Sequence, residues 1–242
     1  ARSNVCNKLI MDKITKHRIQ TYSESKKSIF YNFFKKITLN ARIKFFEYFK
    51  NSTAYDDNKS ILDIGTTPSL DEEQNIILTK TVNNNNITCL SNQDCEILSR
   101  KYNNIKKFVI GDATKINFQN STFDIVHSNA TIEHVGSYQN QISLIKETFR
   151  VSKKYVFIQT PNRYYPIDFH TTLPFIHWLP KDMHRKILKF LGLNFYALEE
   201  NLNLLSEKNL INICNELNIK KFKILKHKLL FLTSNLILII EK

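Results

Sequence analysis

The segment Ser60–Thr67, which reads SILDIGTT, decides the fold. It is an apolar run closed by a glycine, and such a run is typical of a buried parallel strand that ends in a tight turn. Glycine is rare in this chain, with four in 242 residues, whereas average usage near 7% would give roughly 17. A retained glycine indicates a positive φ or a close backbone approach. We therefore expect Gly65 to lie at a strand end that faces a ligand.

Two more glycines stand in comparable places: Gly111 follows the apolar run 108–110, and Gly136 lies just past the run 123–126. Further strand and helix patterns alternate along the chain. They predict strands at 60–65, 86–91, 106–110, 123–128 and 154–160, and helices at 70–80, 93–102, 138–151, 181–191 and 206–217. Ser69 and Glu72 form a potential capping box for the first of these helices. The last two strand-like runs, 221–230 and 235–241, predict an antiparallel hairpin.

This alternation predicts an α/β fold: a Rossmann-like, seven-stranded, mostly parallel sheet with an antiparallel C-terminal hairpin and an N-terminal helical cap. Apolar residues recur at helical spacing near the N-terminus, at Ile29, Phe33, Phe34, Ile37, Ile43, Phe46 and Phe49. We place the cap at 1–57 and the main domain at 58–242. A long irregular insertion at 161–200 would cover a pocket of that domain.

Composition limits the class of protein. A 42% hydrophobic content with 17 Phe and 10 Tyr supplies ample core. The net charge of +13 fits either a generic basic surface or a face that binds a polyanion. Four cysteines without metal spacing, at 6, 89, 95 and 214, indicate reduced thiols. The chain has no signal peptide, and its longest apolar stretch, 229–240, is too short to span a bilayer, so we expect a soluble, cytoplasmic protein.

Polar residues gather where the predicted parallel strands end, at 63–67, 91–94, 111–113 and 127–129. In open α/β sheets this edge holds the ligand. The series resembles class I S-adenosylmethionine-dependent methyltransferases of the type 11-like group, which bind S-adenosylmethionine (SAM) and release S-adenosylhomocysteine. The resemblance implies a set of cofactor-binding residues: Asp63, Gly65, Thr66, Ser91, Gln93, Asp94, Asp112, Ala113 and Asn129.

Two positions depart from the pattern of that family. Thr67 and Ser69 replace the later two glycines of its first motif, which a pyrophosphate would need but SAM, lacking phosphate, does not. Ser91 occupies the usual acidic position of the ribose contact. Structural alternatives stay open for all three acids: Asp63 would orient its own loop, Asp94 would cap the next helix and Asp112 would be a turn residue.

The segments 128–136 (SNATIEHVG) and 160–170 (TPNRYYPIDFH) carry a finer resemblance. Together with 173–174, 177–180, 201–205 and 232–236, they are similar to methyltransferases of bacterial surface-polysaccharide gene clusters. This resemblance implies O-methylation of a small anionic metabolite. Examples are a nucleotide-linked sugar or a phosphoryl intermediate of capsule or surface-polysaccharide biosynthesis. The insertion at 161–200 would then form the acceptor pocket.

Candidate catalytic residues are His170 and His134. A hydroxyl acceptor benefits from a general base, and His170 is the candidate base or acceptor contact, whereas His134 would alternatively orient its loop. Four residues are candidates for substrate binding: Asn162, Arg163, Asp168 and His177. Arginine suits a phosphate or carboxylate, although a solvated loop arginine and a packing role for His177 are alternatives. No metal is expected, because Ala130 stands where some relatives have a first glutamate, and Glu133 with His134 alone makes a poor divalent site.

Two other functions compete with this interpretation. An RNA methyltransferase would use the positive charge and the many aromatic residues, but no appended RNA-binding module is evident, so nucleic acid is not the expected partner. A methyltransferase-like binding subunit without catalysis would explain the reduced glycine loop. We expect no membrane partner, and the sequence leaves the oligomeric state open.

Overall fold

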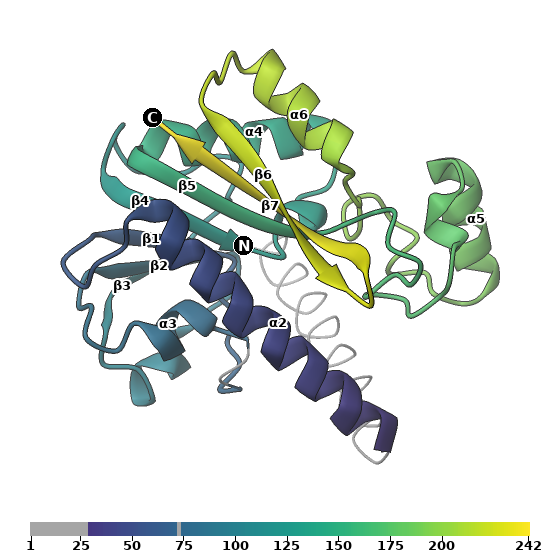
Figure 1. The fold of residues 1–242 in the computed structure, drawn as a ribbon, viewed down its shortest axis with the longest axis horizontal. Helices are drawn as coiled ribbons and strands as arrows, with labels where there is room; N and C mark the ends of the chain where they lie inside the picture. Colours follow the sequence, from purple (N-terminus) through teal and green to yellow (C-terminus); the bar gives the residue numbers. More distant parts are fainter. Residues whose placement is uncertain (1–28, 72–73) are drawn as a thin grey trace, which may run out of the picture. The chain divides into compact units, whose positions relative to one another are not determined.

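The computed structural model describes residues 29–71 and 74–242, which form the elements drawn in Figure 1. The chain divides into two compact units, Ala1–Lys44 and Phe45–Lys242. In chain order, with η for a 3₁₀ helix, the elements are α2 (Ile29–Thr53), β1 (Ile61–Ile64), α3 (Ile76–Lys80), β2 (Ile87–Ser91), η2 (Glu96–Arg100), β3 (Ile105–Ile110), β4 (Phe123–Asn129), η3 (Ile132–His134), α4 (Tyr138–Val151), β5 (Ser152–Pro161), η4 (Ile176–Trp178), α5 (Lys181–Phe190), α6 (Glu207–Glu216), β6 (Phe222–Leu229) and β7 (Leu232–Glu241).

The seven strands form one sheet in the order β3-β2-β1-β4-β5-β7-β6. Neighbours among the first five strands are parallel, and β7 pairs antiparallel with both β5 and β6. The predicted Rossmann-like sheet with its antiparallel hairpin is therefore confirmed. The strand order reverses between β1 and β4, and in open α/β sheets a ligand binds at the carboxyl ends of the strands beside such a reversal.

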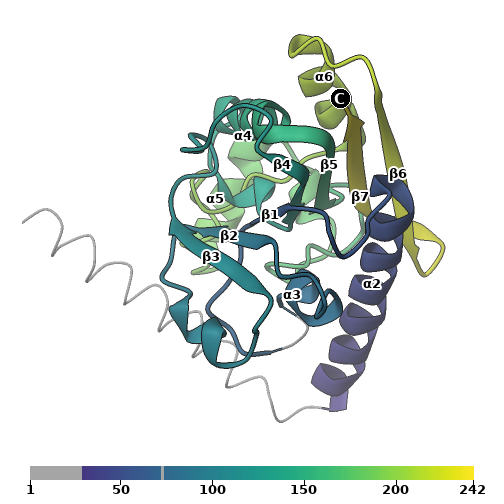
Figure 2. The ribbon, with the colours of Figure 1, turned by 90° about the vertical axis from the view of Figure 1, so that its left-hand side faces the viewer.

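Alternate residues of β1 serve the two faces of the sheet. Leu62 and Ile64 join the core that α4 and α6 cover, and these two helices lie on one side of the sheet (Figure 2). On the other face the end of α2 packs through Phe49, whose ring is 5.4 Å from the ring of His127 and 5.6 Å from that of Phe157. Both faces are thus covered, as the near-continuous apolar strands predict.

Two predicted helices are shorter in the structure. The helix expected at 70–80 begins only at Ile76, because the Asn75 amide donates to the carbonyl oxygens of Thr67 and Ser69 and so holds that stretch as a loop. Of the predicted capping box, Glu72 lies outside the described residues, and the Ser69 hydroxyl accepts a hydrogen bond from the Asp71 N–H. The helix expected at 93–102 is only the 3₁₀ helix η2.

The C-terminal hairpin has a tighter turn than predicted. Leu230 and Phe231 connect β6 to β7 with φ values of 49° and 68°. Two consecutive positive φ values are typical of the two-residue turns whose twist matches a hairpin. The predicted joint, residues 231–234, therefore lies mostly inside β7, which begins at Leu232.

The cysteines within the described residues, Cys89, Cys95 and Cys214, are free and buried, as predicted, and Cys6 lies outside those residues. Burial raises the pKa of the Cys214 thiol to about 12, so this group stays protonated and unreactive near neutral pH. No helix among residues 29–71 and 74–242 combines the length and the apolarity that crossing a membrane requires.

Replacing Phe49 with alanine should destabilise the sheet domain strongly. Phe49 is fully buried on the face of the sheet that carries His127 and Phe157, so its removal leaves a cavity and should lower the free energy of unfolding by about 3–5 kcal/mol. Urea unfolding of Phe49→Ala measures this change, with the exposed Glu47→Ala on the same helix as the control. A loss below about 1 kcal/mol would contradict the packing described here.

Candidate active site

The loops after β1 and β4 meet at Gly65. Its φ is 88°, and a side-chain carbon built on it would collide with the Thr131 hydroxyl. That hydroxyl also donates to the Ile64 carbonyl oxygen over 3.2 Å, which ties the two loops together. Gly65 is therefore required by both its conformation and its surroundings. The sequence predicted the glycine correctly, but not its partner Thr131.

Asp63 lies inside the protein rather than at the surface of the loop. One carboxylate oxygen accepts a hydrogen bond from the Thr66 hydroxyl over 3.0 Å, and the other lies 2.6 Å from Nδ1 of His127 on β4. Its side chain is only 8% exposed. These contacts fit the loop-orienting role that the sequence left open for Asp63, and they place Thr66 as its partner.

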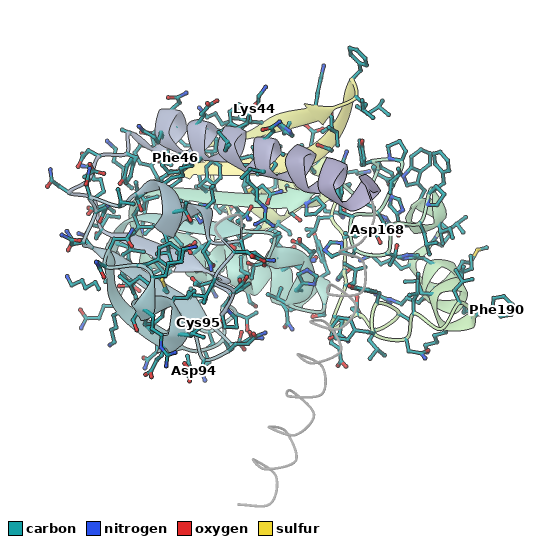
Figure 3. The ribbon with its side chains drawn as sticks, turned by 90° about the horizontal axis from the view of Figure 1, so that it is seen from below. Lys44, Phe46, Asp94, Cys95, Asp168 and Phe190 are labelled. Carbon is teal, nitrogen blue, oxygen red and sulfur yellow. The ribbon has the colours of Figure 1, made fainter. Side chains whose placement is uncertain are left out.

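The acids after β2 and β3 are exposed turn residues. Asp94 accepts a hydrogen bond from the Glu96 N–H over 2.9 Å at the start of η2, where Figure 3 shows it beside Cys95. Asp112, followed by Ala113, accepts hydrogen bonds from the N–H and the hydroxyl of Thr114, both over 2.8 Å. Asp94 thus closes a turn just before η2 and Asp112 closes a turn after β3, and both residues are exposed at the strand ends.

Ser91 connects these two ends. Its hydroxyl accepts a hydrogen bond from the Gln93 N–H over 3.2 Å, and its carbonyl oxygen accepts one from the Gly111 N–H over 2.8 Å. The residues predicted to bind ribose and adenine are therefore held on adjoining turns. Asn129, at the end of β4, contributes its carbonyl oxygen to the Thr131 hydroxyl.

The strand ends suit a polar ligand without phosphate. The hydroxyls of Thr67, after β1, and Ser128, near the end of β4, are buried and have no hydrogen-bond partner among the described residues. Buried hydroxyls are normally paired, so these two indicate a ligand or water at this edge. Together with the exposed carboxylates of Asp94 and Asp112, they are polar groups that this edge of the sheet offers to a ligand.

The two predicted catalytic histidines meet, although 36 residues separate them. Nε2 of His134, on η3, lies 3.2 Å from Nε2 of His170, in the insertion after β5. Nδ1 of His134 lies 2.6 Å from the Asn201 carbonyl oxygen. Because a carbonyl oxygen only accepts, Nδ1 of His134 carries the proton.

Asp168 fixes His170 from the other side. One carboxylate oxygen accepts hydrogen bonds from the backbone N–H of His170 and from its Nδ1–H over 3.0 and 3.1 Å, and the other accepts from the Thr171 hydroxyl over 2.7 Å. These donors hold the pKa of Asp168 well below its usual range, although its burial opposes the shift. Asp168, predicted to bind substrate, is thus a residue that positions His170.

Glu133 completes the cluster and was missed as a site residue. It is fully buried, and one carboxylate oxygen accepts a hydrogen bond from the Thr160 hydroxyl over 2.9 Å. Burial raises its pKa, and the nearby His170 opposes that shift. The sequence offered only its position beside His134. Only the structure shows that Glu133 is buried and that it contacts Thr160 of β5.

The other predicted substrate residues, Asn162, Arg163 and His177, all make structural hydrogen bonds, and Arg163 and His177 also line a pocket. The side-chain amide of Asn162 donates to the Thr233 carbonyl oxygen over 2.8 Å and so links β5 to β7. The Arg163 guanidinium donates to the carbonyl oxygens of His177 and Leu179 over 3.1 and 2.9 Å. Nε2–H of the buried His177 donates to the Tyr165 carbonyl oxygen over 2.7 Å.

Arg163 and His177 also line a small pocket of about 20 Å³. Lys181, His184 and Arg185 line it as well, and the Glu199 carboxylate lies 3.1 Å from the Arg185 guanidinium and balances one of these charges. Burial, followed by the charge of Arg163, lowers the pKa of Lys181. The pocket is therefore a concentrated positive site.

Asn203 joins this basic pocket to the histidine cluster. Its side-chain oxygen accepts a hydrogen bond from the Lys181 ammonium over 2.5 Å, and its backbone N–H donates to the Glu133 carbonyl oxygen over 2.7 Å. Gln141 of α4 donates to the Asn203 carbonyl oxygen over 2.6 Å. The pocket and the cluster are thus neighbouring parts of one site, and Asn203 was not predicted.

Comparisons with known proteins agree with this geometry. Residues 74–158 match the family described as methyltransferase domain. No curated protein matches the chain. Among solved structures, a SAM-dependent methyltransferase from Aquifex aeolicus is 12% identical, with a TM-score of 0.56 over 86% of this chain and 95% of that one.

Two further structures share the fold. A SAM-dependent methyltransferase from Methanosarcina mazei is 16% identical, with a TM-score of 0.52 over 81% of this chain and 96% of that one. The Haemonchus contortus phosphoethanolamine N-methyltransferase 2, in complex with phosphomonomethylethanolamine and S-adenosylhomocysteine, is 14% identical, with a TM-score of 0.51 over 76% of this chain and 38% of that one. The family match over residues 74–158 and the fold shared with these structures support a methyltransferase that depends on S-adenosylmethionine as its cofactor.

Proposed function

We propose that this methyltransferase methylates an oxygen atom of a small anionic acceptor. The basic pocket beside the histidine cluster carries the proposal, because Arg163, Lys181 and Arg185 gather there and, within the described part of the chain, only Arg185 is paired with a carboxylate, that of Glu199. Guanidinium and ammonium groups bind phosphates and carboxylates through charge-assisted hydrogen bonds. A nucleotide-linked sugar or a phosphoryl intermediate of capsule or surface-polysaccharide biosynthesis fits this chemistry. That finer identity rests on the sequence resemblance, which is a weaker argument than the site.

The strand ends would hold the cofactor, which supplies an activated methyl group on a sulfonium when bound. Asp112 and Ala113 would contact adenine, and Ser91, Gln93 and Asp94 the ribose. The loop at Gly65 and the end of β4 at Asn129 would hold the rest of the cofactor. These residues would accelerate the reaction by holding the cofactor in place, since orienting two reactants removes much of the entropic part of the barrier.

The histidine cluster would act on the acceptor oxygen. His170 is held by Asp168 and His134 by the Asn201 carbonyl oxygen, so both rings are fixed before an acceptor arrives. A cavity of about 20 Å³ has room for about one water molecule. The anionic group of the acceptor would therefore lie at the mouth of the basic pocket, which directs its hydroxyl toward the histidines.

Removing one pocket cation should weaken acceptor binding. Lys181→Gln loses a charge-assisted contact, so the KM for a nucleotide-linked sugar should rise about 10-fold or more, with kcat less affected. Transfer of a radiolabelled methyl group from SAM measures both constants. Lys186→Gln, on the exposed side of the same helix, removes the same charge outside the pocket and serves as the control.

An equal KM in the two variants would contradict an anionic acceptor at this pocket. Turnover on RNA with a steep loss of binding between low and moderate salt would instead favour the RNA alternative.

His170→Gln should lower kcat by about 100-fold or more, because it removes the group that acts on the acceptor oxygen. The affinity for S-adenosylhomocysteine should stay within about 2-fold, since the ring lies on the acceptor side of the site. Steady-state kinetics and calorimetric titration measure the two effects. A variant with unchanged kcat would exclude His170 from catalysis.

A further inference from the structure

Three potential metal-ligand atoms converge in the histidine cluster. Nε2 of His134 and Nε2 of His170 lie 3.2 Å apart, and the Oε1 atom of Glu133 lies 4.0 and 3.8 Å from them. All three atoms fall within 4.8 Å of one another. They come from η3 and from the insertion after β5, so the fold rather than a sequence motif assembles them.

Both imidazoles present an electron pair to the same point. Nδ1 of His170 donates to the Asp168 carboxylate, and Nδ1 of His134 donates to the Asn201 carbonyl oxygen. In neutral rings the two Nε2 atoms are therefore acceptors, and two acceptors 3.2 Å apart repel unless a proton or a metal ion lies between them. A second ring nitrogen bonded to a carboxylate or carbonyl is also the usual arrangement of a histidine that binds metal.

Glu133 provides independent evidence for a cation. Its side chain is fully buried, and its Oε1 has no hydrogen-bond partner among the described residues, whereas Oε2 is bonded to Thr160. A buried carboxylate oxygen without a partner is costly. Asp168 places a second buried carboxylate on the other side of His170. One proton shared by the imidazoles leaves one of these two negative charges uncompensated, whereas one divalent ion balances both.

We propose that Glu133, His134 and His170 bind a divalent transition-metal ion. Ligand distances of about 2.0–2.2 Å place adjacent ligand atoms about 3.0–3.5 Å apart, so the two nitrogens are already spaced correctly and Glu133 needs to move by about half an ångström. Two imidazoles and one carboxylate suit Zn²⁺, Fe²⁺, Co²⁺ or Mn²⁺ better than Mg²⁺, and three protein ligands leave coordination positions open. The site is inferred for this chain from its own residues.

The role of the ion rests on the proposed function. An open position would accept the acceptor oxygen and favour its deprotonation, with the proton passing to solvent. His134 and His170 would then be ligands, and Asp168 would position His170. Ala130 cannot ligate, as the sequence analysis states. What the sequence did not reveal is that His170 supplies the third ligand.

Metal titration of the chelator-stripped full-length chain tests the site without any acceptor. Co²⁺ should give visible absorption bands that saturate at one ion per chain, and Zn²⁺ should displace it and raise the melting temperature. Glu133→Gln and His170→Gln should weaken metal binding by about 100-fold or more. Asp168→Asn should weaken it by about 10–100-fold, as expected for a residue that bonds to a metal ligand rather than to the metal itself. His184→Gln, a histidine of the same insertion outside the triad, should bind like the wild type.

Two results would overturn the site. One is a folded wild-type chain that binds S-adenosylhomocysteine but takes up no metal. The other is metal binding that Glu133→Gln and His170→Gln leave unchanged. S-adenosylhomocysteine titration and circular dichroism on every variant report folding and the cofactor site separately. Failure of the metal site therefore leaves the proposed methyl transfer standing, with the histidine pair acting by proton transfer.

Discussion

The close approach of two loops at Gly65 is the constraint on which the site depends. The loops follow β1 and β4, the strands between which the sheet order reverses. A side chain at position 65 would collide with the Thr131 hydroxyl, and the φ of 88° is itself unfavourable for other residues. A chain with four glycines keeps one here because the Thr131 side chain approaches the Gly65 backbone, and this contact shapes the edge at which we propose that the cofactor binds.

The acceptor side is built from three segments far apart in sequence. The insertion after β5 contributes Asp168 and His170, the loop after β4 contributes Glu133 and His134, and the segment before α6 contributes Asn203. Hydrogen bonds join each pair of segments, so the basic pocket and the histidine cluster have fixed positions relative to each other. In the proposed function, the positive charge at the pocket would bind the anionic group of the acceptor, and the histidine cluster with its two buried carboxylates would act on the acceptor hydroxyl.

Much of the fold was predictable because it depends on local patterns. Apolar runs predicted every strand within a few residues, and their alternation predicted the parallel sheet. The helix predicted at 70–80 was wrong at its start because Asn75 bonds to carbonyl oxygens six and eight residues earlier, a contact that propensity does not encode. The hairpin joint was misplaced because Leu230 and Phe231, rather than glycines, adopt the positive φ values of the turn.

The candidate site was predictable only in part. Residue type and strand position predicted a cofactor edge, and His134 and His170 were selected separately as catalytic candidates. Their contact, the buried Glu133 and the link through Asn203 arise from tertiary packing across 36 to 70 residues, which no local pattern reveals. For the same reason Asn162 was predicted to bind substrate, whereas its amide connects two strands.

Calorimetric titration with S-adenosylhomocysteine tests the central claim most directly, with wild type compared with Asp112→Ala. Asp112 is exposed at the end of β3, so its replacement should leave the fold intact. The account predicts micromolar binding by the wild type and a loss of at least about 10-fold in the variant, as expected for a charged hydrogen-bond partner. Absence of binding by the folded wild type at millimolar ligand would contradict a cofactor site at these strand ends.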